Sequence, residues 1–342
     1  MLSILFLCIS PVTIRACVIV FFACSLYLLS RRDLLLSSLL SSPLLQLVLF
    51  PPKGVILRRV RSTSPVRLNP RHPWSTHWSS LNPRVTVRTS MPHWKIILTY
   101  DGTSFNGWQI QPTLPTIQGT LAQAIHRITG ESVLPQGSGR TDAGVHALGQ
   151  VASFSLTVPI PAPNLHRALN RALPPSIRVL AIDQVPEDFH ARHSARQKTY
   201  EYRISTADIC SPMLAPYVWD CHLPLDLATL QNAADHIRGT HDFTSFAAVD
   251  PDLTTRTDQP PTSCLRTIHH SSWRRDEHLL TYRVKGTGFL HHMVRNLVGT
   301  FVEAGAGRIS ADDIPAILTA HNRNAAGPTA PAKGLFLIEV EY

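Results

Sequence analysis

Strand-like and helix-like segments alternate from residue 94 to the C-terminus, and this alternation limits the folds that the chain can adopt. Apolar residues at every second position indicate strands, whereas apolar residues three or four apart indicate amphipathic helices. Strands are expected at 94–100, 152–156, 176–185, 198–205, 264–273, 278–286 and 334–342, and helices at 116–130, 163–173, 227–239, 291–305 and 310–320. Short strands mixed with helices favour an α+β fold in which helices cover a sheet.

Local signals mark the ends of several of these elements. Thr116 is expected to cap the first helix, and Gly130 to end it. The polar run Arg274–Glu277 between two strands predicts the turn of a hairpin. Ser310 and Asp313 have the spacing of a capping box. The proline-rich stretch Pro251–Pro261 is expected to be a surface loop.

Residues 1–90 differ in composition from the rest of the chain. The hydrophobic segment 16–32 is shorter than the ~20 residues that span a bilayer, and an acid-free stretch rich in Arg, Pro and Ser follows it. From Met91 onwards the sequence has the composition of an ordinary folded protein. Residues 1–90 are therefore interpreted as a disordered extension or an over-long gene start. The alternative is a membrane anchor or targeting segment within residues 1–32. A native protein of the full 37.9 kDa would rule out a start at Met91.

The net charge of +9 does not describe the main body of the chain. Residues 1–90 hold 11 Lys and Arg side chains against one acid, whereas residues 91–342 hold 21 against 22. Any nucleic-acid site in the body must therefore be a local patch. The six cysteines form no C-x-x-C pair, which argues against a zinc ribbon. The His190/His193 and His291/His292 pairs lack an H-E-x-x-H pattern, so no metal site is expected.

The run GSGRTDAGVHALGQVASF, residues 137–154, is the strongest candidate for a functional loop. A phosphate-binding loop would need a glycine followed by Lys and Ser or Thr, and none is present. A dinucleotide site would need a third glycine at position 142, which is Asp, and a helix where a strand is expected. Asp142 is then either a turn residue that caps local backbone donors or a catalytic carboxylate on a glycine-supported loop. The residues alone leave both readings open.

The run GRTDAGVHALGQVASF closely resembles the signature of the tRNA pseudouridine synthase A (TruA) family. Further blocks resemble that family in the same order, and the resemblance covers about residues 93–342. They are YDGTSFNGWQIQP, DFHARHSARQKTYEYRI, HDFTSFAA, GTGFLHHMVRNLVGTFVEAGAG and APAKGLFLIEVEY. The sequence departs from the family pattern at His193, where Phe is usual, and at Lys198, where Arg is frequent.

The resemblance implies an isomerase that converts uridine to pseudouridine at positions 38, 39 or 40 of the tRNA anticodon stem-loop. No atoms are gained or lost in this reaction, so no cofactor is expected. Asp142 is implied to be the catalytic nucleophile, since a free carboxylate is ionised at neutral pH. Arg140 would orient Asp142 or hold the flipped nucleotide. Tyr200 would stack on the displaced base, and Arg295 would pair with Asp142 or a phosphate.

The resemblance also implies the organisation of the molecule. We expect two similar α/β subdomains, a catalytic one at 91–190 and a second at 191–342, joined in one central sheet with outer helices and a cleft between the halves. The partners are expected to be transfer RNA and a second copy of the chain, in the cytoplasm, with no membrane contact unless residues 1–32 are expressed. The alternative function is a non-catalytic tRNA-binding paralogue of the same fold.

Overall fold

The structure is a computed structural model that describes residues 91–248 and 263–342. The expectations for residues 1–90 and for the Pro251–Pro261 loop lie outside these ranges. In the described ranges no helix combines the length and apolarity that crossing a membrane requires.

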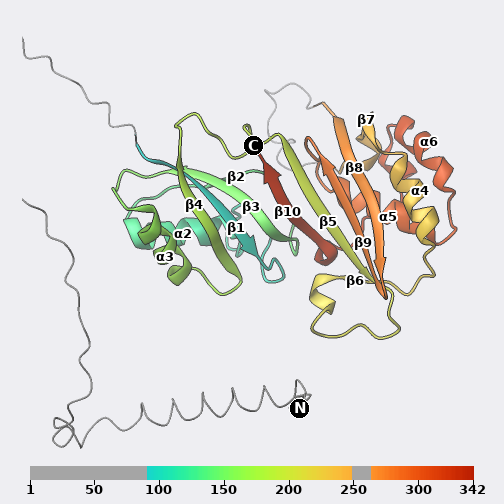
Figure 1. The fold of residues 1–342 in the computed structure, drawn as a ribbon, viewed down its shortest axis with the longest axis horizontal. Coiled ribbons are helices and arrows are strands. Elements are labelled where there is room, and N and C mark those ends of the chain that lie inside the picture. The colour runs from blue at the N-terminus through green and yellow to red at the C-terminus, as the bar shows by residue number, and fades with distance from the viewer. Residues whose placement is uncertain (1–90, 249–262) are drawn as a thin grey trace, which may run out of the picture. The chain divides into compact units, whose positions relative to one another are not determined.

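One mixed 10-stranded sheet forms the centre of the described chain, in the order β4-β1-β3-β10-β5-β9-β8-β7 (Figure 1). The short strands β2 and β6 pair with β3 and β5. The strand bounds are β1 His93–Tyr100, β2 Gln136–Gly137, β3 His146–Ser155, β4 Ile177–Val185, β5 Gln197–Ser205, β6 Trp219–Asp220, β7 Gly239–Asp242, β8 Leu265–Asp276, β9 Leu279–Gly286 and β10 Leu335–Glu341. The α+β fold with a single central sheet is therefore confirmed.

The last strand, β10, joins the two halves of the sheet. It runs parallel to β3, with Phe336 opposite His146, and antiparallel to β5, with Leu337 opposite Tyr200. Figure 1 shows β10 between the strands of the N-terminal half and those of the C-terminal half. The end of the chain therefore joins β3 and β5, which are not consecutive in the sequence. The boundary expected at residue 190 stays a prediction.

The helices pack against the sheet in two groups. The α-helices are α2 Ile117–Thr129, α3 Ala162–Ala172, α4 Leu227–Asp235, α5 Met293–Gly305 and α6 Ile314–Thr319. Helix α3 contacts α2 and β4, and α4 contacts β8 and α5. Short 3₁₀ helices lie at Ala215–Tyr217, Thr244–Phe246, Ala311–Asp313, Arg323–Ala325 and Ala332–Gly334.

Element ends follow the local signals closely. The Thr116 side chain accepts a hydrogen bond from the Gly119 amide at the start of α2, and Gly130 ends it in the left-handed conformation. The capping box of Ser310 and Asp313 also forms. The expected four-residue turn Arg274–Glu277 is wrong in extent, because β8 continues to Asp276 and only residues 277–278 turn. Exposed charged side chains fit a strand end that faces solvent as well as they fit a turn.

Candidate active site

Besides the segment 106–111, three segments that are distant in sequence meet at one cavity of about 590 Å³. The first is the loop 138–145 between β2 and β3, which carries the glycine-rich run. The second is the start of β5, and the third is the segment that leads into α5. Residues that line the cavity include Asn106, Arg140, Asp142, Arg192, Lys198, Tyr200, Phe289, His291 and His292. The volume lies within the usual range for a site that takes one small molecule or a single nucleotide.

Glycines allow the loop 138–145 to pack tightly against the segment 101–108. Gly107 has a φ of +82°, and a Cβ there would lie 2.5 Å from the Thr141 carbonyl oxygen. A Cβ at Gly137 would lie 2.5 Å from the Trp108 ring, which is buried. The amide of Trp108 donates to the Thr141 carbonyl, at 2.9 Å. Two of the motifs therefore form one packed unit, in which a side chain at either glycine would separate the loops.

Buried polar side chains hold the same loop from beneath. The Gln150 amide donates to the Gly139 carbonyl at 2.9 Å, and its oxygen accepts from the Ser138 hydroxyl at 2.7 Å. The Tyr100 hydroxyl lies 2.8 Å from the Thr141 hydroxyl. Gln150 is fully buried on β3. Because both ends of its amide are paired, Gln150 fixes the loop at Ser138 and Gly139, just before Arg140, without an unsatisfied polar atom.

Asp142 carries the densest set of charged contacts in the cavity. Arg295 donates from Nη1 to Asp142 Oδ2 at 2.8 Å. His292 Nε2 lies 3.3 Å from the same oxygen, and His291 Nε2 lies 3.7 Å from Oδ1. The Asp142 side chain retains 20% of its exposure. Among the contacts within the described ranges, two groups lie within 3.3 Å of Oδ2, whereas His291 lies 3.7 Å from Oδ1, so Oδ1 is the oxygen better placed to meet a substrate.

Arg295 is itself fixed in the first turn of α5. Its Nε donates to the Ala330 carbonyl at 2.8 Å, and the Ala330 amide donates back to the Arg295 carbonyl at 3.1 Å. A Cβ at Gly299 would lie 1.7 Å from the Pro328 carbonyl oxygen, so only glycine lets α5 approach this segment. The guanidinium therefore reaches Asp142 as part of a rigid arrangement that includes the segment 328–330, which precedes β10.

The Tyr200 ring forms an apolar wall of the cavity. Tyr200 is 7% exposed, and its ring meets that of Phe289 edge to face, with centroids 4.9 Å apart. Burial raises the pKa of the Tyr200 hydroxyl, and the nearby Tyr100 and Asp142 raise it further. The hydroxyl is therefore protonated at neutral pH. A buried aromatic face beside a carboxylate suits stacking on a planar base.

The structure brings the site residues expected from the sequence together around one cavity. Asp142, Arg140 and Tyr200 line one cavity, and Arg295 contacts Asp142. Arg140 is exposed at the cavity. The departure at His193 leaves packing intact, because its ring is exposed and lies 4.3 Å from that of His190.

Sequence reasoning gave no role in the site to Gln150, His291, His292 or Lys198. Gln150 carried a usable signal, since a polar residue in an apolar strand is unusual at a buried position. The two histidines were weighed only as metal ligands. Burial lowers the pKa of His292. The charge of Asp142 raises this pKa, whereas the charges of His291 and Arg295 lower it further.

Asp142, His291 and His292 also have the geometry of a possible metal site, which sequence spacing did not indicate. One ligand atom from each lies within 4.8 Å of the others. The positive charge of Arg295 at Asp142 Oδ2 opposes a cation at this point. The three basic side chains are therefore better suited to fixing the Asp142 carboxylate than to sharing a metal ion with it.

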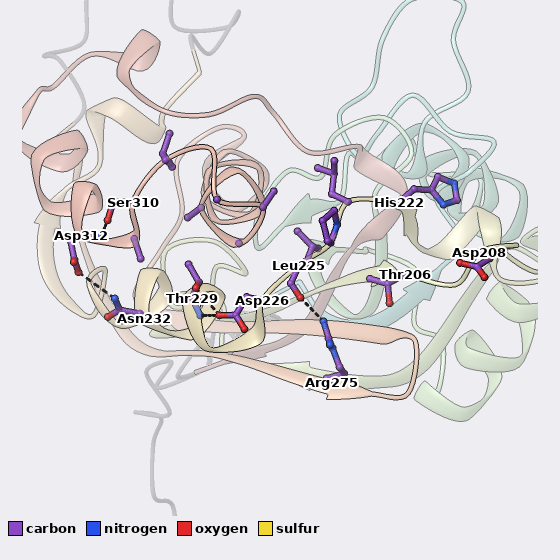
Figure 2. A pocket seen from close by; sticks show the side chains of 18 residues that line it. Thr206, Asp208, His222, Leu225, Asp226, Thr229, Asn232, Arg275, Ser310 and Asp312 are labelled. Atoms are coloured by element: carbon purple, nitrogen blue, oxygen red, sulfur yellow. Dashed lines mark hydrogen bonds between the residues drawn. The ribbon is translucent and has the colours of Figure 1, made fainter.

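A larger cavity, of about 990 Å³, lies elsewhere among α4, α5 and the Ala311–Asp313 turn (Figure 2). Its polar groups mostly satisfy one another. Asp226 accepts from the Thr229 amide as the cap of α4, and Arg275 donates to the Leu225 carbonyl (Figure 2). Asn232 donates to Asp312 at 3.3 Å. These contacts stabilise helix ends and a turn, so they need no ligand to explain them.

Comparisons with known proteins agree with the geometry. Residues 96–194 and 233–342 match the family model described as tRNA pseudouridine synthase. The chain is 50% identical over 249 residues to tRNA pseudouridine synthase A of Solibacter usitatus, covering 72% of this chain and 98% of that protein. It is 44% identical over 254 residues to the enzyme of the same name from Moorella thermoacetica, covering 74% and 100%. With that of Acetivibrio thermocellus it shares 42% identity over 248 residues, covering 72% and 98%.

Proposed function

The chain belongs to the tRNA pseudouridine synthase family, and from this premise we propose that it isomerises uridine to pseudouridine in tRNA through Asp142. The bond between the uracil N1 and the ribose C1′ breaks, the base turns, and a bond from C5 to C1′ replaces it. C5 loses a proton and N1 gains one, so the reaction is balanced without a redox or energy cofactor. The single observation that carries the proposal is the Asp142 carboxylate, held by Arg295 in the cavity that Tyr200 lines.

Asp142 acts as the nucleophile in this scheme. Arg295 and His292 hold Oδ2, so Oδ1 is left to approach the uridine. A carboxylate with one oxygen fixed loses little freedom on reaction, which favours attack from a single direction. Arg140 is exposed at the cavity and is proposed to grip the flipped nucleotide. Tyr200 is proposed to stack on the displaced uracil, an interaction worth about 1–3 kcal/mol.

The target uridine must leave the stack to reach Asp142, at a cost of a few kcal/mol. We propose that it lies at positions 38, 39 or 40 of the anticodon stem-loop. The enzyme is proposed to be a homodimer that acts in the cytoplasm, where its substrate is found. Pseudouridine mapping in tRNA from a deletion strain tests the positions, and sedimentation of the purified protein tests the dimer.

The Asp142→Asn variant distinguishes catalysis from simple tRNA binding. It keeps the size of the side chain and removes the nucleophile. We expect no pseudouridine to form, while tRNA binding stays within about twofold, because the rest of the cavity is unchanged. Full activity in this variant would contradict the assignment of Asp142. An inactive wild-type protein that still binds tRNA would favour the non-catalytic paralogue.

A further inference from the structure

Lys198 is a charged side chain inside the cavity that the proposed mechanism does not yet use. It lies two residues before Tyr200 on β5, so the two side chains share one face of the strand. Its strand is flanked on both sides, by Gly286 of β9 and by Val340 of β10. Lys198 therefore lies within the sheet and is half-buried where it lines the cavity, whereas Arg140 and Arg192 are exposed.

The Lys198 ammonium is held directly beneath the loop that carries Asp142. Nζ donates to the Ser138 carbonyl at 2.6 Å. A Cβ at Gly139 would lie 3.0 Å from Nζ and 3.9 Å from the Tyr200 hydroxyl oxygen. Gly139 thus leaves space through which Lys198 and Tyr200 can both face the cavity.

Among the residues that the structure describes, the charge of Lys198 has no counterion. An ammonium group has three donors, and within residues 91–248 and 263–342 only the Ser138 carbonyl accepts from it. No carboxylate of these ranges forms an ion pair with it, and its charged neighbours include Arg192 and Arg266. A largely buried charge is normally paired, so an incoming substrate is the natural source of the missing acceptor.

We propose that Lys198 contacts the target uridine, donating a hydrogen bond to a carbonyl oxygen of its uracil ring. This inference rests on the proposed isomerisation. When the bond between N1 and C1′ breaks, its electron pair stays on the base and spreads over the carbonyl oxygens. Lys198 keeps its proton and stabilises that charge until C5 bonds to C1′. Donors placed at developing charge are a major source of rate enhancement in enzymes.

The position of Lys198 favours the base over a phosphate as its acceptor. Lys198 shares its strand face with Tyr200, the proposed stacking partner of the uracil, and lies under the loop of Asp142. We expect the phosphates of the substrate to stay near the solvent, where Arg140 and Arg192 are exposed. Lys198, which is less exposed than these two arginines, is therefore placed for the uracil carbonyl oxygens.

Lys198→Met tests the proposal, with Lys285→Met as a matched control. Methionine is similar in length but cannot donate. Lys285 lies on the neighbouring strand β9 and pairs with Glu341 at 2.7 Å. With saturating tRNA in single turnover, we expect the rate constant of Lys198→Met to fall about 100-fold, while the Kd for tRNA stays within about twofold. Lys285→Met should match the wild type in both. Asp142→Asn, measured alongside, tests the proposed function independently.

Two results would overturn the role of Lys198. One is a normal rate constant at saturation with a raised Kd and a weaker salt dependence of binding, which would mean a phosphate contact. The other is no change in either constant.

A measurement on the wild type covers the case in which Lys198→Met does not fold. Burial, together with Arg192 and Arg266, lowers the pKa of Lys198 to about 8. The ammonium is present below that pH and lost above it, so the single-turnover rate constant should fall as the pH rises through about 8. Other charged or titratable groups that line the same cavity are Arg140, Asp142, Arg192, Tyr200, His291 and His292. Burial raises the pKa of Tyr200 and lowers that of His292, and both move away from pH 8. A rate constant that does not fall up to pH 9 would contradict the proposal.

Discussion

Arg295 and Asp142 are separated by 153 residues, yet Nη1 of the arginine donates to Oδ2 of the aspartate at 2.8 Å. The pair joins the loop after β2 to the first turn of α5, and so connects the two halves of the sheet at the site. The Arg295 side chain is only 15% exposed, and its Nε is held by the Ala330 carbonyl. A partly buried pair of this kind is well suited to fixing one oxygen of a nucleophile.

Replacement of Arg295 by alanine should impair chemistry more than folding. Asp142 would lose the donor that fixes Oδ2, and we expect the single-turnover rate constant to fall about 100-fold or more. Arg308→Ala is the matched control. Arg308 pairs with Glu303 of α5 at 2.9 Å, but its side chain is 54% exposed and remote from the cavity lining. Equal losses in the two variants would show that the position of Asp142 does not depend on Arg295.

Gly107→Ala should destabilise the loop that carries Asp142. The backbone has a φ of +82° there, and the added Cβ would lie 2.5 Å from the Thr141 carbonyl oxygen. The strain and the clash together should lower the free energy of unfolding by about 3 kcal/mol. Gly130→Ala separates the two effects, because its φ is +76° but nothing lies within 4 Å. It should cost only about 1 kcal/mol. Urea unfolding measures both, and equal losses would contradict the close packing at Gly107.

Local structure was predictable from sequence because its causes are local. Thr116 and Gly130 define α2 through hydrogen bonds within a few residues. The contact between Asp142 and Arg295 depends instead on β10 entering the sheet between β3 and β5, which no local pattern encodes. Only the family resemblance pointed to Arg295. The roles of Lys198 and Gln150 also depend on tertiary neighbours, although Gln150 in an apolar strand was a visible anomaly.

Gln150→Leu should loosen the loop 138–145 without replacing any side chain that lines the cavity. The Gly139 carbonyl and the Ser138 hydroxyl would lose their buried partner. Unsatisfied buried groups cost about 1–3 kcal/mol each, so we expect about 3 kcal/mol lower stability in urea unfolding. The rate constant should fall about tenfold, since small displacements of reacting groups are costly. Gln136→Leu is the control, because its side chain is exposed and, among the described residues, donates to the Leu134 carbonyl alone. Unchanged stability and an unchanged rate constant in Gln150→Leu would show that the loop 138–145 keeps its conformation without this side chain.

Stability should fall as the pH drops below about 6.5, in part because of His146. This ring is 1% exposed, and the Gly102 amide donates to its Nδ1 at 3.1 Å. Burial lowers the pKa of His146, and the opposing effect of Asp101, 3.2 Å away, is smaller. A pKa that is lower in the folded chain means that folding favours the neutral ring. Its contribution is therefore complete above the unfolded pKa of about 6.5 and is lost at lower pH.

The comparison of His146→Asn with His222→Asn isolates this contribution. The His222 side chain is 65% exposed, and its nearest carboxylate, on Asp220, is 3.6 Å away. Unfolding in urea between pH 7.5 and 5 should show a shallower dependence of stability on pH in His146→Asn than in the wild type. His222→Asn should keep the wild-type dependence. The difference cannot exceed about 1.4 kcal/mol per pH unit, since one proton is involved. Parallel curves for the wild type and His146→Asn would mean that the ring takes up a proton as readily in the folded chain as in the unfolded one.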